Sequence, residues 1–151
     1  MEPGENLSGQ LIYAGRLCRA LRADLLQEFG IHAGQDLLLK SLSQNDGQTM
    51  SSIARELGVR PPTVTKMVAR MESQGLLRRQ DSPTDNRSSH VHLTEDGRRL
   101  LAHIDEAWQK TDDLVFGELR AKDGKRLAKI LVRIITSLGG EVKSGQDSGE
   151  L

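Results

Sequence analysis

Three short runs of apolar residues at helical spacing lie between residues 32 and 75. The first, residues 32–44, predicts a supporting helix. The second, residues 50–58, predicts a short amphipathic helix that ends in a left-handed turn at Gly58. The third, residues 59–75, opens with prolines, which a helix tolerates at its start because a missing N–H costs nothing there. The pattern indicates two helices joined by a tight, glycine-containing turn.

The third run separates its apolar and polar side chains onto two faces of the predicted helix. The predicted buried stripe, with spacings of three and four, consists of Val64, Met67, Val68 and Met71. The opposite face is short, polar and cationic, so it suits base-edge contacts, with lysine and arginine on phosphates. The candidate DNA contacts on and around these two helices are Ser51, Arg60, Pro62, Thr63, Thr65, Lys66 and Arg70. A solvated helix face has the same composition, so this helix alone does not decide between the two interpretations.

A β-hairpin is predicted directly after these helices. The segments 76–79 and 88–93 have the alternation of strands, and the residues between them are turn formers. Arg87 lies near the tip, two residues after Asp85, a spacing at which the carboxylate can hold the guanidinium extended toward a minor groove. Together with Ser88, these two residues complete the set of candidate DNA contacts. A helix-turn-helix followed by such a wing favours the DNA-binding interpretation of the preceding helix.

These segments resemble the winged helix of the MarR family of bacterial transcriptional regulators. The matching motifs are Ser-x-x-Ala-x-x-Leu-Gly-Val at 51–59, Pro-Pro-Thr-Val-Thr-Lys at 61–66, Gly-Leu-Leu-x-Arg at 75–79, and Asp85-x-Arg87 followed by Leu93-Thr94-x-x-Gly97. The resemblance covers roughly residues 6–138 and implies an obligate homodimer whose first and last helices interlock. It departs at Arg60, where the family has a serine or threonine N-cap and arginine cannot accept a hydrogen bond. We interpret Arg60 as a phosphate or base contact instead.

The flanking segments predict long helices with one apolar face each. In the first helix, apolar residues repeat in alternating steps of four and three from Leu7 to Leu25, a seam that needs a neighbouring helix. Thr94 heads a capping arrangement for a long helix, and a last helix follows a break around residues 117–124. The predicted fold is mainly α with a small β-wing, a winged helix-turn-helix lobe plus a helical dimerisation lobe. The predicted organisation is one chain at 1–138, with dimerisation helices at about 6–29 and 95–138, a winged helix at about 32–94, and a disordered tail at 139–151.

Composition and charge agree with this organisation. Aromatic residues make up 3% of the chain and charged residues 28%, which disfavours a large interior without a partner subunit. The formal net charge is zero, but residues 51–94 hold seven Lys/Arg against four acidic residues, a net +3 that leaves −3 elsewhere. We expect the positive part to face DNA. One cysteine, an acidic N-terminus and the lack of an apolar run near 18 residues predict a cytoplasmic protein without membrane contact.

Three features outside this pattern each allow two interpretations. Cys18 suits an oxidant sensor, because some MarR relatives sense peroxide through a first-helix cysteine, but it also suits packing in the apolar seam, which we favour. His90 and His92 point to one side of a strand, yet no carboxylate or cysteine cluster completes a metal site, so no metal or cofactor is expected. Trp108 suits a ligand pocket or, as we favour, a packing anchor.

The predicted function is transcriptional regulation, not catalysis, because no catalytic or phosphate-binding constellation occurs at workable spacing. We expect a homodimeric repressor that binds a pseudo-palindromic double-stranded operator through two recognition helices. The resemblance implies a small aromatic or phenolic effector where the dimerisation helices meet the DNA-binding lobe, with Arg16 and His32 as candidate contacts. Two alternatives stay open: an oxidant-responsive regulator acting through Cys18, and a protein-interaction module without DNA contact. The cationic Lys66, Arg70 and Arg87 speak against the second.

Overall fold

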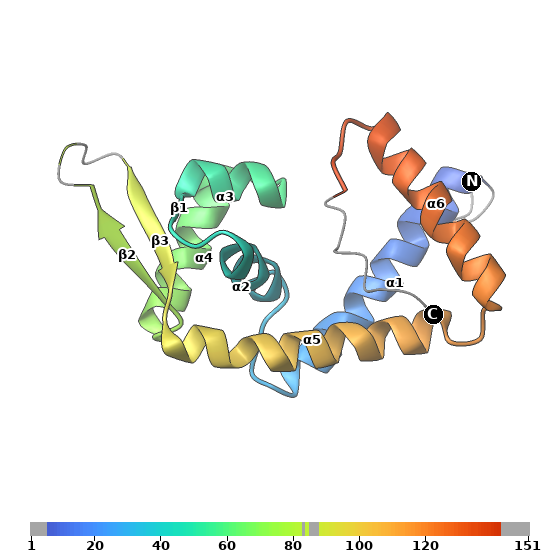
Figure 1. The fold of residues 1–151 in the computed structure, drawn as a ribbon, viewed down its shortest axis with the longest axis horizontal. Helices are drawn as coiled ribbons and strands as arrows, with labels where there is room; N and C mark the ends of the chain where they lie inside the picture. Colours follow the sequence, from blue (N-terminus) through green and yellow to red (C-terminus); the bar gives the residue numbers. More distant parts are fainter. Residues whose placement is uncertain (1–5, 83, 85–87, 143–151) are drawn as a thin grey trace. The chain divides into compact units, whose positions relative to one another are not determined.

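The protein is mainly helical with one small antiparallel sheet, as the sequence predicts (Figure 1). The computed structural model describes residues 6–82, 84 and 88–142. Its elements, in chain order, are α1 (Leu7–Gln27), α2 (Gln35–Gln44), β1 (Gln48–Thr49), α3 (Met50–Leu57), α4 (Pro61–Ser73), β2 (Leu77–Asp81), β3 (Ser89–Leu93), α5 (Glu95–Phe116) and α6 (Ala121–Ser137). The chain forms two compact units, residues 1–112 and 113–151, with the boundary inside α5.

Local capping explains where the helices of the first unit begin and end. Thr49 Oγ1 accepts a hydrogen bond from Ser52 N at 3.2 Å and begins α3, which ends at Gly58 in the left-handed conformation, with φ 64°. The predicted turn at Gly58 is therefore confirmed. Thr94 Oγ1 accepts from Gly97 N at 3.1 Å, which confirms the predicted cap of α5. Arg60 is the N-cap of α4 and makes no side-chain capping bond there.

The sheet has the strand order β1-β3-β2, and both pairings are antiparallel. The predicted hairpin is present as β2 and β3, shifted by one or two residues from the predicted bounds. Leu77 pairs with Leu93 and Arg79 with Val91, so Leu77, Val91 and Leu93 share the buried face. The two-residue strand β1 was not predicted from the sequence, because a segment of that length has no detectable alternation.

The core of the first unit lies between the helices α2, α3 and α4 and the sheet, and it includes side chains from α1 and α5. Its largest fully buried side chains are Leu26, Ile31, Leu38, Leu39, Leu42, Ile53, Val64, Val68, Met71, Leu77, Val91 and Ile104. The predicted stripe of α4 is thus confirmed, with Met67 only half-buried. Leu37 breaks the pattern of α2, because it is exposed while its neighbours Leu38 and Leu39 are buried.

The second unit contains α6, and none of the side chains on α6 is buried. Gly124 lies inside this helix, so the predicted break at 117–124 is too long; the break occupies residues 117–120. The helix can start at Ala121 because Asp123 sits in its first turn and binds Arg120 at 2.8 Å. Most of the predicted tail, from residue 143 onward, lies outside the described residues. In the part of the chain that the structure describes, no helix combines the length and hydropathy of a membrane span.

Candidate nucleic-acid interface

The candidate contacts predicted for the outward face of α4 and its margin lie at the surface. Pro62, Thr63, Thr65, Lys66 and Arg70 are all exposed, while Val64 and Val68 behind them are fully buried. Thr65 Oγ1 donates to the carbonyl of Pro61 at 3.1 Å, so its hydroxyl proton is used within the helix. Thr63 is two residues nearer the helix start and makes no such bond within the described residues. Thr63 therefore keeps its hydroxyl free for an outside partner, and Thr65 offers mainly an acceptor.

The other candidate contacts lie around this face with differing support. Ser51 is exposed on α3, with its hydroxyl 3.2 Å from that of Thr49. Arg60 is exposed at the start of α4, as its interpretation as a contact requires. Ser88 is half-buried, and its carbonyl accepts from Ser82 N at 3.2 Å, which extends the hairpin ladder by one bond. The predicted contacts Asp85 and Arg87 lie outside the described residues.

Two carboxylates hold the strands of the wing, and sequence reasoning missed both. Glu72, in the last turn of α4, accepts from the Arg79 backbone N at 2.9 Å and from Arg79 Nε at 3.2 Å. Asp46 Oδ1 accepts from Leu93 N at 2.9 Å, and Asp46 Oδ2 lies 3.5 Å from Arg98 Nη2. No local pattern could identify Asp46, because its partner lies 47 residues away. Glu72 is seven residues from Arg79 across a turn, and helical spacing does not relate the two.

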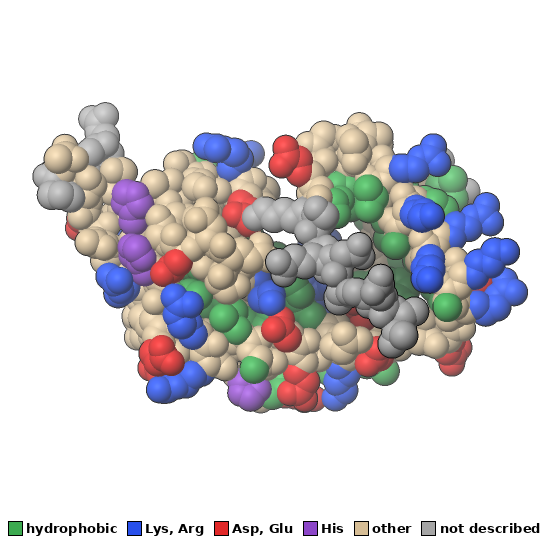
Figure 2. All heavy atoms as spheres, in the orientation of Figure 1, with side chains coloured by type: hydrophobic (Ala, Val, Ile, Leu, Met, Phe, Trp, Pro, Cys, Tyr) green, Lys and Arg blue, Asp and Glu red, His purple; other side chains and the backbone are tan. Residues whose placement is uncertain are grey.

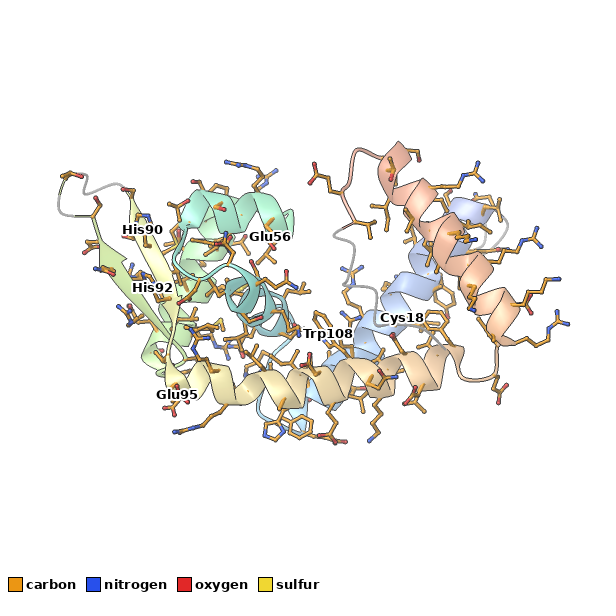
Figure 3. All side chains as sticks on the ribbon, in the orientation of Figure 1. Cys18, Glu56, His90, His92, Glu95 and Trp108 are labelled. Atoms are coloured by element: carbon orange, nitrogen blue, oxygen red, sulfur yellow. The ribbon has the colours of Figure 1, made fainter. Side chains whose placement is uncertain are left out.

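The two wing histidines lie on the outer face of β3 (Figure 3). His90 pairs with Gln80 and Thr49, and His92 pairs with Arg78, so this face is polar throughout. His92 Nδ1 lies 3.5 Å from Asp46 Oδ2, and the imidazole rests against Gly47. Among the described residues, no three His, Cys, Asp or Glu side chains gather to hold a metal ion.

The positive charge is divided between two parts of the chain. Besides the net +3 of residues 51–94, residues 120–138 carry six Lys/Arg and one acidic residue, a net +5. On α6, Lys122, Lys125, Arg126, Lys129 and Arg133 are exposed, and Figure 2 shows several of the helix's basic side chains at the surface. The sequence argument that the positive charge gathers at the winged helix is therefore incomplete, because the remainder's net −3 conceals a strongly cationic helix.

A second polar cluster surrounds Trp108 on α5 (Figure 3). Its indole Nε1 donates to the buried Asp36 Oδ2 at 2.9 Å, which supports the interpretation of Trp108 as an anchor. Arg22 Cζ lies 4.9 Å from the ring centroid and Lys40 Nζ lies 5.6 Å from it. Lys40 is paired with Asp105 at 2.6 Å, whereas Arg22 Nε is buried without a hydrogen-bond partner in the described structure.

Arg16 and His32, the effector contacts predicted from the sequence, interact with residues outside this cluster. Arg16 Cζ lies over the ring of Tyr13, 5.5 Å from its centroid, and His32 is exposed, with its backbone N bonded to the Gln35 side chain at 3.0 Å. Cys18 is half-buried on α1, an environment that suits the packing interpretation. Arg22 is the residue that sequence reasoning overlooked, because its unpaired nitrogen depends on which helices surround it.

Comparisons with known proteins agree with the geometry of the helices and the wing. Residues 31–89 match the sequence profile of the MarR family. A Thauera aromatica protein provisionally named as the transcriptional regulatory protein for the hcr operon is 30% identical over 105 residues, covering 70% of this chain and 63% of that protein. This chain spans less than two thirds of the length of the curated relatives that it matches.

Solved structures show the same fold over nearly the whole chain. The crystal structure of MarR superposes with a TM-score of 0.80 at 20% identity, covering 92% of this chain and 95% of that chain. The S. aureus MepR–DNA complex superposes with a TM-score of 0.78 at 22% identity, covering 87% and 98%. At these identities the superpositions establish a shared fold, the winged helix with flanking helices.

Proposed function

Because residues 31–89 match the MarR family, we propose that this chain is a MarR-type, sequence-specific DNA-binding transcriptional regulator. The observation that carries the proposal is the outward face of α4, which is polar, cationic and free of intramolecular ion pairs among the described residues. A base-reading helix needs such side chains at its start. The MepR structure was solved with DNA, and its fold is shared by this chain. A DNA-binding role also favours a cytoplasmic location.

Each candidate contact has a distinct role in this proposal. Thr63, with its free hydroxyl near the helix start, reads a base edge, whereas Lys66 and Arg70 bind phosphates. Arg60 and Ser51 add contacts to the phosphate backbone beside the helix start. At the wing, Arg87 reaches the minor groove with support from Asp85 and Ser88.

The regulator acts as a homodimer on a pseudo-palindromic operator. Two segments present apolar side chains to solvent: on α1 these are Leu7, Leu11, Ile12, Tyr13 and Leu17, and on α6 they are Ile130, Val132 and Ile135. A single chain that leaves so many large apolar groups exposed is typical of one half of an obligate dimer. The dimer places two α4 helices on successive major grooves and represses by excluding polymerase.

The decisive experiment compares Thr63→Ala with Lys66→Ala on an operator selected from a random DNA pool. Lys66→Ala should weaken binding to all sequences and lower the salt slope by about one unit, because one phosphate contact is lost. Thr63→Ala should relax the preference at one base position by about 1–3 kcal/mol. Equal, sequence-independent losses for both variants would remove Thr63 as a base reader. Failure of the full-length protein to select any sequence would favour the protein-interaction alternative.

An anionic aromatic effector controls the proposed regulator, and the Trp108 cluster is a better candidate site for it than Arg16 or His32. Arg22 supplies a buried nitrogen without an acceptor, and the Trp108 ring supplies an aromatic surface. Benzoate and its neutral counterpart benzamide test this site by calorimetry. Benzoate should bind the wild type and lose at least tenfold in affinity with Arg22→Gln, while benzamide should bind neither. Unchanged benzoate binding by Arg22→Gln would exclude the cluster.

Oxidant control through Cys18 remains the second proposal for regulation. Half-burial in α1 disfavours it, since reactive cysteines occupy accessible, electropositive surroundings. Cys18→Ser should leave the response of DNA binding to peroxide unchanged if packing is the role of this thiol.

A further inference from the structure

The strands of the wing are each held by a carboxylate that belongs to neither strand. Glu72 comes from the end of α4 and binds β2, and Asp46 comes from the loop before β1 and binds β3. We infer that Glu72 and Asp46 are positioning residues that set the direction of the wing relative to α4, so that wing and helix meet the same DNA. The inference rests on the proposed DNA-binding function and assigns these residues a role within it.

Glu72 acts on the free edge of the sheet. Strand β2 is an edge strand, since the order is β1-β3-β2, and its outward N–H groups have no neighbouring strand to bond. Glu72 Oε2 accepts from one of them, Arg79 N, while Glu72 Oε1 receives Arg79 Nε and Nη2, both at 3.2 Å. Because a backbone amide is held along with the guanidinium, the contact fixes the path of the strand and not only a side chain.

Asp46 acts on the opposite side of the hairpin, just before β1 begins at Gln48. Gly47 N donates to the carbonyl of Val91 at 3.0 Å, but β1 offers no carbonyl to accept a hydrogen bond from Leu93 N. Asp46 Oδ1 accepts that hydrogen bond instead, at 2.9 Å. Its other oxygen lies 3.5 Å from both His92 Nδ1 and Arg98 Nη2, which joins β3 to the first turns of α5.

The side chain of His92 also packs against the loop that carries Asp46. A Cβ on Gly47 would lie 2.9 Å from His92 Cε1, so the imidazole packs directly on the backbone of the loop that carries Asp46. With β2 held to α4 and β3 held to α5, the hairpin is restrained at both of its edges. Loss of either carboxylate frees one edge, and the direction in which the tip leaves the sheet changes with it. Both carboxylates are engaged with the strands themselves, so neither is assigned a DNA contact.

The test is a double-mutant cycle with Arg87→Ala, which removes the wing contact itself. On the selected operator, Glu72→Gln and Asp46→Asn should each weaken binding about tenfold, which is about 1.4 kcal/mol. In the Arg87→Ala background, each should cost less than about twofold, because a wing without its contact gains nothing from correct placement. Protection of the minor groove from hydroxyl radical should disappear, while protection of guanine N7 in the major groove from dimethyl sulfate should persist. The matched control is Asp96→Asn, which breaks the exposed Asp96–Arg99 pair of 2.9 Å on α5 and should change neither affinity nor footprint.

Additive losses of DNA affinity in the cycle, or equal loss of protection in both grooves, would show a general structural role and overturn the inference.

Amide hydrogen exchange of Arg79 and Leu93 provides a readout without DNA. Glu72→Gln should speed exchange at Arg79, and Asp46→Asn should speed exchange at Leu93, with helical amides unchanged. If the wild type binds no DNA, the proposed function fails. The exchange data still decide whether the carboxylates hold the strands. Slow exchange in both variants would refute the restraint directly.

Discussion

The winged helix and the helix α6 contain the same kinds of apolar side chains, but these side chains are buried in the winged helix and exposed on α6. In the first unit, Leu38, Leu39 and Leu42 of α2 have no exposed surface, and they pack with residues from α3, α4 and β3. On α6, Ile130 is 42% exposed and Leu138 at its end is 80% exposed. Leucine and isoleucine are equally hydrophobic in both places. The difference teaches that one region completes its core within the chain, while the other leaves apolar side chains exposed, as the proposed homodimer requires.

The helix α1 shows both situations within one element. Its C-terminal residues Leu25 and Leu26 are buried in the core of the first unit, while Leu7 at its start is 84% exposed. The seam predicted from the sequence is therefore continuous as a pattern but only partly covered in the single chain. This division supports the proposed homodimer, because the uncovered half begins where the contacts with the winged helix end.

Removal of α6 should affect folding and dimerisation more than any of the substitutions below. A chain ending at Arg120 loses the second apolar face, so we expect aggregated or unfolded protein at micromolar concentration. A chain ending at Gly139 retains all of α6 and serves as the control; it should remain dimeric with unchanged DNA affinity. Sedimentation of both proteins measures the outcome. A well-folded monomer from the shorter chain would contradict the dimer proposal and the geometry of two successive grooves.

A pair of single substitutions should separate the two kinds of apolar surface. Leu39→Ala creates a cavity in the closed core and should lower the free energy of unfolding by about 2–5 kcal/mol. Ile130→Ala removes apolar surface that the proposed dimer would cover, so it should raise the dimer dissociation constant at least tenfold, about 1.4 kcal/mol. Denaturation at two protein concentrations and sedimentation measure the two effects. A dissociation constant unchanged by Ile130→Ala would place the interface elsewhere.

Two glycine substitutions should give effects of opposite sign. Gly97 on α5 lies against the carbonyl of Leu76, where an added Cβ has no room, so Gly97→Ala should destabilise the fold by about 1–3 kcal/mol. Gly15 in α1 has open space around its Cβ position, so Gly15→Ala should stabilise the helix by about 0.5–1 kcal/mol. Thermal unfolding of both variants tests this. Destabilisation by Gly15→Ala would instead show that the partner subunit packs closely against this part of α1.

The sequence determined by itself the features that depend on neighbours a few residues apart. The left-handed Gly58, the Thr94 cap and the two faces of α4 all follow from capping chemistry and helical spacing, and each is present in the structure. The same local signals placed Thr63 and Lys66 on the exposed side of the candidate interface. Local rules succeed here because one turn of helix, or one cap, involves side chains that the chain itself keeps adjacent.

Only the tertiary structure decided the contacts between distant residues. Strand β1 exists because two residues lie beside β3, and Asp46 reaches Leu93 across 47 positions. Trp108 donates a hydrogen bond to Asp36, 72 positions away in the sequence. The unpaired Arg22 nitrogen is buried where the Arg22 guanidinium lies over the Trp108 ring. Such pairings depend on how helices and strands pack, which no period of three or four residues encodes. A carboxylate in a loop has the same local pattern whether it faces water or holds a strand, and only its neighbours in space distinguish the two roles.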